Sequence, residues 1–136
     1  MSDLAVMPDI DSALLDLAAM FGLPGVDAAN IRGKAPTPGS SILPAVQIYT
    51  YDGRADQLGG EAIFDVHCFA TTYPAASLLA RTFDAKIMQY PHRVGGNGST
   101  VLLDVVENLS IPTEVSWVED NSVRRFQATY SVSFRR

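Results

Sequence analysis

Cysteine, tryptophan and histidine are scarce in this chain, and long apolar runs are missing. The only cysteine, Cys68, cannot form an intramolecular disulfide, which excludes a disulfide-stapled secreted scaffold. No stretch reaches the roughly 18 apolar residues that a membrane-spanning helix needs. The N-terminus has neither a basic start nor an apolar core, so we expect no signal peptide and no membrane contact.

Basic residues are also few. The chain has 10 Lys and Arg against 15 Asp and Glu, a formal net charge of −5, and this disfavours a protein that grips nucleic acid. Hydrophobic residues make up 47% of the sequence, which is enough to build a core. The length of 136 residues predicts a single domain over 1–136.

Three segments are expected within that domain. Residues 1–22 hold an N-terminal helix, because apolar side chains recur at helical spacing over Ile10–Phe21, after Asp9 or Asp11 as a cap. Residues 23–44 are a long connection rich in proline and glycine. Residues 45–136 are expected to form a sheet with a second helix.

Four strand-like segments in that last part lie as two pairs on either side of the helix. β-branched and aromatic residues predict strands over Ala45–Tyr51, Glu61–Thr71, Thr100–Ile111 and Ser122–Arg136, and a helix over Tyr73–Met88. The predicted fold class is therefore α+β. We expect a mainly antiparallel four-stranded sheet, with the N-terminal and central helices packed on it. After the N-terminal helix, the elements follow one another along the chain in the order β-β-α-β-β.

The last strand alternates most cleanly. Phe126, Ala128, Tyr130, Val132 and Phe134 are expected to point inward, and the polar residues between them outward. The outward face is basic and rich in hydroxyl groups in an otherwise acidic chain. It suits contact with an acidic face of a neighbouring subunit, and the hypothetical interface residues are Arg125, Gln127, Thr129 and Arg135. Simple solubility is the alternative.

The predicted hairpin loop Asp52–Gly60 gathers three acids, Asp52, Asp56 and Glu61. A glycine-rich exposed tip would not hold carboxylates in the fixed geometry of acid–base catalysis. The acids are either a solvated loop or an acidic element that repels a polyanion.

No catalytic, cofactor or metal motif is evident. His67 and Cys68 are adjacent on a strand and therefore face opposite sides, so the histidine cannot easily activate the thiol. His92 lies far along the chain, and two histidines with one cysteine match no zinc pattern. Gly95–Ser99 lacks the Lys-Ser/Thr pair of a phosphate-binding loop. We expect a protein that is not an enzyme and needs no cofactor.

Several segments resemble, in order, the tail terminator proteins of long-tailed bacteriophages, also called tail-to-head joining proteins. These are the strand after Pro44 (Ala-Val-Gln-Ile-Tyr), the charged hairpin, the strand Ala62–Ala70, the helix that starts at Tyr73, and the closing strand Arg124–Phe134. The resemblance covers roughly Pro44 to Arg136 and is one of pattern and order.

The resemblance implies a small α/β sandwich that forms a hexameric ring on the tail tube. Such a ring stops tube polymerisation, docks to the head through a connector (neck) protein and lets DNA pass through its channel. It also implies a location at the head-proximal end of the virion tail, and assembly in the host cytoplasm. Asp52, Asp56 and Glu61 would then face the channel or the tube. A head-completion protein, a tail-tube subunit, a dimeric interaction module and a small cytoplasmic enzyme or ligand-binding domain remain alternatives.

Overall fold

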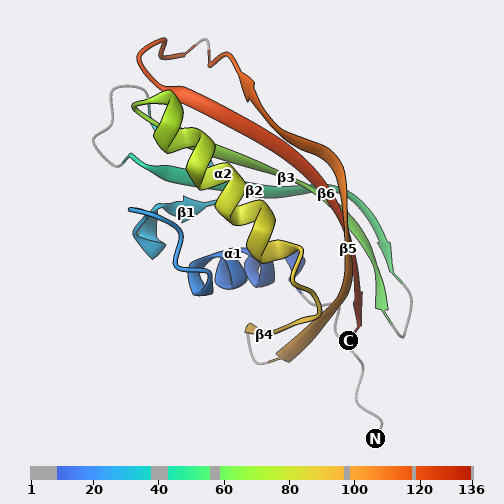
Figure 1. The fold of residues 1–136 in the computed structure, drawn as a ribbon. Coiled ribbons are helices and arrows are strands. Elements are labelled where there is room, and N and C mark those ends of the chain that lie inside the picture. Colours follow the sequence, from blue (N-terminus) through green and yellow to red (C-terminus); the bar gives the residue numbers. More distant parts are fainter. Residues whose placement is uncertain (1–8, 38–42, 56–58, 97–98, 118, 136) are drawn as a thin grey trace, which may run out of the picture.

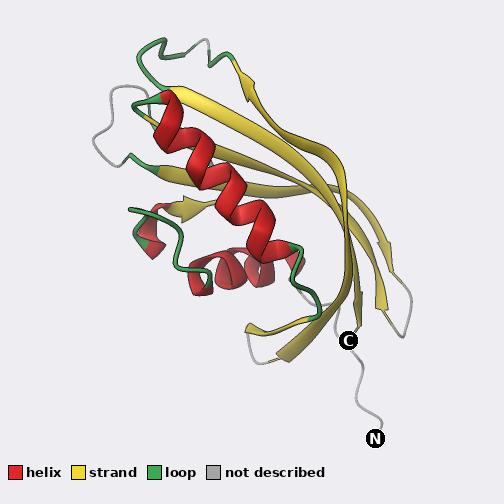
Figure 2. Cartoon of the chain, viewed as in Figure 1, coloured by secondary structure: helices red, strands yellow, loops and turns green. Residues whose placement is uncertain are grey.

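A computed structural model of the chain describes residues 9–37, 43–55, 59–96, 99–117 and 119–135. One six-stranded sheet of order β1-β2-β3-β6-β5-β4 organises them, together with two α-helices (Figures 1 and 2). The elements in chain order are α1 (Ile10–Met20), a 3₁₀ turn η1 (Ala28–Asn30), β1 (Ile31–Arg32), β2 (Ala45–Ala55), β3 (Gly59–Ala70), α2 (Tyr73–Ile87), β4 (His92–Gly96), β5 (Ser99–Val115) and β6 (Arg124–Arg135).

The prediction of a four-stranded antiparallel sheet is wrong, because two further strands extend it and one of them makes it mixed. β1 pairs in parallel with β2, through Ile31 and Arg32 alone, and β4 pairs antiparallel with β5. β1 falls within the connection rich in proline and glycine, and β4 runs into a glycine-rich stretch. Such short strands in sequence rich in proline or glycine show no alternation of apolar and polar residues, so the sequence pattern could not identify them.

The sheet is strongly curved, and both helices lie on its concave side (Figure 1). α2 crosses β3, β6 and β5, while α1 lies beside β1, β2 and β4. The predicted inward set of β6 is confirmed, since all five side chains are buried. Phe64, Tyr130 and Phe83 meet at the centre, with the Phe64 and Tyr130 ring centroids 5.5 Å apart.

Both helices begin where the sequence predicts. The Asp9 carboxylate accepts a hydrogen bond from Ser12 N at 3.0 Å, and Thr72 Oγ1 accepts one from Ala75 N at 3.3 Å. Such caps satisfy backbone N–H groups that have no partner within the helix. A second carboxylate, Asp11, accepts from Thr50 N at 2.8 Å and so ties α1 to the edge of β2.

A partly buried hydrogen-bonded group holds α2 on the sheet. Asp84 Oδ1 accepts from the hydroxyl of Tyr130 at 2.8 Å and from the side-chain amide of Asn108, also at 2.8 Å. Burial raises the pKa of the Tyr130 phenol, and the hydrogen bond to Asp84 raises it further. The phenol therefore stays protonated at neutral pH and remains a donor.

The hairpin β2–β3 is longer than the sequence predicts. Instead of a loop over Asp52–Gly60, β2 continues to Ala55 and β3 begins at Gly59, with an irregularity in the pairing between Thr50 and Asp52. A Cβ on Gly60 would collide with the carbonyl oxygen of Arg54. Glycine therefore lets these backbones come close, and what looks like loop sequence forms paired strands.

Candidate assembly surfaces

The acidic hairpin is exposed at its described end. Asp52 Oδ1 accepts from Gly53 N at 2.8 Å, and Glu61 pairs with Arg54 at 3.3 Å, with both partners well exposed to solvent. Asp56 lies outside the described residues. The structure thus places Asp52 and Glu61 on the two strands of one hairpin, and Arg54 lies beside them. An ion pair this exposed contributes little to stability.

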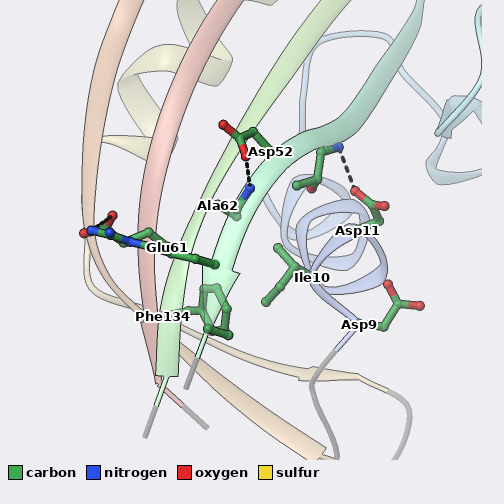
Figure 3. Close-up of a pocket in the computed structure, with 11 residues that line it drawn as sticks. Asp9, Ile10, Asp11, Asp52, Glu61, Ala62 and Phe134 are labelled. Carbon is green, nitrogen blue, oxygen red and sulfur yellow. Dashed lines mark hydrogen bonds and ion pairs between the residues drawn. The ribbon is translucent and has the colours of Figure 1, made fainter. Parts of the chain in front are cut away.

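A pocket of about 410 Å³ lies between this hairpin and the start of α1 (Figure 3). Its floor is apolar and consists of Ile10, Ala62 and Phe134, each at most 8% exposed. Asp9 and Asp11 line the side formed by α1. In Figure 3, Ile10 points towards Phe134, while Asp52 and Glu61 lie on the side of the hairpin away from α1. The pocket therefore combines an apolar floor with acidic surroundings.

The outward face of β6 is engaged within the chain at every residue predicted to form an interface. Arg135 pairs with Asp104, and Arg125 donates to the carbonyl oxygen of Ser116 at 2.7 Å. Gln127 and Thr129 both donate to Asp65, at 3.4 and 2.7 Å. A neighbouring subunit would therefore meet side chains already held in place. The assignment of Arg125, Gln127, Thr129 and Arg135 to a subunit interface stays a prediction.

Asp65 and His67 lie beside that face, and the sequence did not predict that these two polar residues are buried. Asp65 is 7% exposed and accepts three hydrogen bonds, the third from the Tyr49 hydroxyl at 3.2 Å. His67 is 5% exposed, although it lies on the side of its strand opposite to the core residue Cys68. Its ring is stacked between Tyr49 and Phe69, at centroid distances of 5.7 and 6.3 Å. Neither ring nitrogen has a hydrogen-bond partner among the described residues.

The connection between β5 and β6 explains this burial. Trp117 packs edge-on against Phe69, with 5.0 Å between the ring centroids, and Val123 joins them in a small second cluster. The cluster lies on the opposite face of the sheet from the helices. Phe69 lies on the otherwise polar side of its strand, and an aromatic residue in that position is the sequence signal for such a cover.

Both margins of the sheet are only partly covered. β1 pairs with Val46 and Gln47, and Asp11 bonds to Thr50, but no described residue pairs with the outer side of β2 over Tyr51–Ala55. Likewise, β4 covers β5 only up to Leu103. Beyond it β5 exposes Val105, Leu109 and Ile111, the last 71% exposed. Unpaired strand edges of this kind are sites where another strand can add.

The groups considered for catalysis lie apart. Burial raises the pKa of the Cys68 thiol to about 12, so the thiol is protonated at neutral pH. His92 bonds to the carbonyl oxygen of Ile87 at 2.9 Å at the end of α2. In the part of the chain that the structure describes, no three His, Cys, Asp or Glu side chains gather as a metal site would require. Of the described helices, none has the length and apolar character to cross a membrane.

Comparisons with known proteins bear on the fold. No family model matches the sequence, and no curated protein does so. A solved chain described as belonging to the virion of a native gene transfer agent particle aligns with a TM-score of 0.51 and 14% identity, covering 88% of this chain and 84% of its own. A second solved chain, described without a functional name, aligns with a TM-score of 0.47 and 14% identity, covering 93% and 89%. The first similarity shows a shared fold.

Proposed function

We propose that the chain is a structural protein of a phage-like virion. The observation that carries this proposal is the shared fold with a chain of a gene transfer agent virion, which extends over most of both chains. The partly uncovered sheet margins support it, because structural subunits need surfaces for their neighbours. We further propose that the protein catalyses no reaction and takes part in assembly alone.

Within the virion we propose the role of tail terminator. The protein would form a ring, expected to be a hexamer, at the head-proximal end of the tail. It would cap the tail-tube protein, stop tube growth and present a surface to the connector (neck) protein, while DNA passes without specific binding. Support comes from the resemblance over Pro44–Arg136. It also comes from the two sheet margins, which differ from each other, as a closed head-to-tail ring requires.

The acidic hairpin is proposed to face the channel or the tube, through Asp52, Asp56 and Glu61. A basic lumen would bind DNA and slow its passage, whereas carboxylates repel it. Reversing charge with Asp52→Lys and Glu61→Lys should lower the yield of infectious particles, whether or not tails of normal length form. Both side chains are exposed, so folding should be retained. The control reverses Asp16 and Asp27, which are exposed outside the hairpin. Equal yields from both variants would remove the hairpin from the proposal.

The test of the role itself is imaging of the purified protein at high concentration, alone and with its tail tubes. Six-fold rings with a hole wide enough for duplex DNA, or rings on tube ends, are expected. Stacked tubes from the protein alone would instead identify a tail-tube subunit, and particles bound only to connectors would identify a head-completion protein. Dimers that bind neither would overturn the virion proposal.

A further inference from the structure

The free part of the β2 edge has the properties of a binding site for an extended chain. Tyr51–Ala55 are all exposed, and Asp52–Ala55 pair on one side with β3, just after the irregularity at Tyr51. Five residues of strand present about 17 Å of edge, enough for a short segment to add as a further strand. Backbone hydrogen bonds along such an edge supply affinity, and pockets for alternate side chains supply selectivity.

The pocket of about 410 Å³ lies directly beside this edge, on the concave side of the hairpin (Figure 3). Its size lies in the range of roughly 300–1,000 Å³ that is usual for ligand sites. The floor of Ile10, Ala62 and Phe134 is apolar, so a side chain that enters it should be aliphatic or aromatic. A strand added to β2 would direct every second side chain towards this floor.

The remaining side chains of such a strand would face the convex side, where the surface is acidic. Glu61 pairs across the sheet with Ser133, which belongs to the outward set of β6, and Asp52 and Arg54 line a second hollow there with Glu61 and Ser131. On the concave side, Asp9 and Asp11 of the α1 start line the pocket and add to the negative charge near the edge. Arg54 is already paired with Glu61, and the ion pairs of the described residues include none to Asp9, Asp11 or Asp52. The local charge is therefore negative and suits Lys or Arg.

We propose that the β2 edge over Tyr51–Ala55, with the adjoining pocket, binds an extended segment of a partner protein in which apolar side chains alternate with Lys or Arg. A second copy of this chain fits less well. Its own uncovered strand edge, on β5, carries Glu107, and Glu114 there is already paired with Arg124, so β5 offers no Lys or Arg of its own to the acidic hairpin. This inference requires no ring and can be tested separately from the proposed function.

The probe is an acetylated and amidated peptide, Thr-Lys-Val-Lys-Ile-Lys-Thr, added to the full chain. Binding is measured by titration calorimetry, and the contact site by hydrogen exchange of individual backbone amides. We expect slower exchange over Tyr51–Ala55, and weaker binding as salt is raised. A peptide with Ser in place of Val and Ile should bind at least about tenfold more weakly, since burying one aliphatic side chain contributes that much. A peptide with Glu in place of Lys should not bind measurably.

The matched protein variant is Asp52→Asn with Glu61→Gln, which removes two charges and keeps side chains of nearly the same shape. It should weaken binding of the Lys peptide several-fold. The control, Asp16→Asn with Asp27→Asn, removes the same charge from exposed positions away from the edge and should leave affinity unchanged. Emission of Trp117, the only tryptophan, verifies folding of each variant.

Equal binding of the Lys and Glu peptides, or protection confined to other residues, would overturn the proposal. So would equal affinities of the two charge variants. Protection of Tyr51–Ala55 by raised protein concentration without peptide would assign the edge to a second copy and overturn the partner assignment.

Discussion

Replacement of His67 by phenylalanine should stabilise the protein. The imidazole lies between the rings of Tyr49 and Phe69, nearly parallel to both, with interplanar angles of 11° and 19°. It is 5% exposed, and no described group bonds to either ring nitrogen. A phenyl ring can occupy the same stack and brings no polar atom into it.

The expected gain follows from the unpaired nitrogens. A buried polar group without a partner costs about 1–3 kcal/mol. The phenyl ring removes this cost, but it is larger than imidazole, so crowding against its neighbours cancels part of the gain. We therefore expect His67→Phe to raise the free energy of unfolding by about 1 kcal/mol at neutral pH. For a domain of this size that is an increase in Tm of roughly 4 °C.

The gain should grow as the solution becomes more acidic. Burial lowers the pKa of His67 below its usual range, and the nearby Arg125 guanidinium lowers it further, against the opposing effect of Asp65. Below a pH of about 6.5, the unfolded chain therefore binds a proton at this residue that the folded chain does not. The wild type should lose stability as pH falls through this value, whereas the variant lacks this contribution.

Thermal unfolding at pH 7.5 and pH 5.5, followed by Trp117 emission, measures both effects. Trp117 packs on Phe69, next to the histidine, so its emission also shows whether the cover of the sheet stays in place. His67→Gln is the matched control, because it removes the titration and keeps a buried polar side chain. It should flatten the pH dependence without the gain at pH 7.5. A phenylalanine variant that is less stable than wild type, or equally dependent on pH, would refute the reasoning.

Three further predictions concern the core and the hairpin. Tyr130→Phe should lower the free energy of unfolding by about 1–2 kcal/mol in urea, because Asp84 loses a buried donor; no loss would mean that the bond contributes nothing net. Phe83→Ala should lower the free energy of unfolding by about 3–5 kcal/mol, since the side chain is 2% exposed at the centre of the core. A loss under 1 kcal/mol in the same assay would show that neighbouring side chains move in to fill the cavity. Gly60→Ala should speed amide exchange along the hairpin, because the new methyl group meets the carbonyl oxygen of Arg54; unchanged exchange would show that the strands have room to separate.

The elements that the sequence predicted well are those in which local pattern and tertiary burial agree. The alternation of β6 specified which side faces the core, since a shift of one residue would have buried its polar set. The helix α2 begins at its Thr72 cap and ends one residue before the predicted end. In both cases the same side chains satisfy the local preference and the packing, so the pattern alone was sufficient.

The features that the sequence missed depend on residues far apart in the chain. Asp65 is buried because its partners come from β2 and β6, up to 64 residues away in the sequence. His67 is buried because Trp117 and its neighbours cover the next ring on the same strand. A polar residue on the outward side of a strand gives no local sign of such a cover. β1 was missed for a related reason, because two residues acquire strand geometry only through the strand beside them.

The parts of the sheet that are covered within the chain are not free for contacts with other subunits. α1 and α2 cover much of the concave face, and the pocket between α1 and the hairpin stays open to a partner's side chain. On the convex face the Trp117 cluster and the hydrogen bonds to Asp65 cover one end of the sheet. Among the described residues, two parts of the sheet stay uncovered: the hairpin end, with the free edge of β2, and the margin of β5 with its exposed Leu109 and Ile111. Both regions carry acidic residues, but they differ in apolar character, because the β5 margin exposes large aliphatic side chains. A contact between copies that packs these two regions together, without pairing their strand edges, would therefore be head-to-tail, and a head-to-tail contact closes into a ring or continues as a filament.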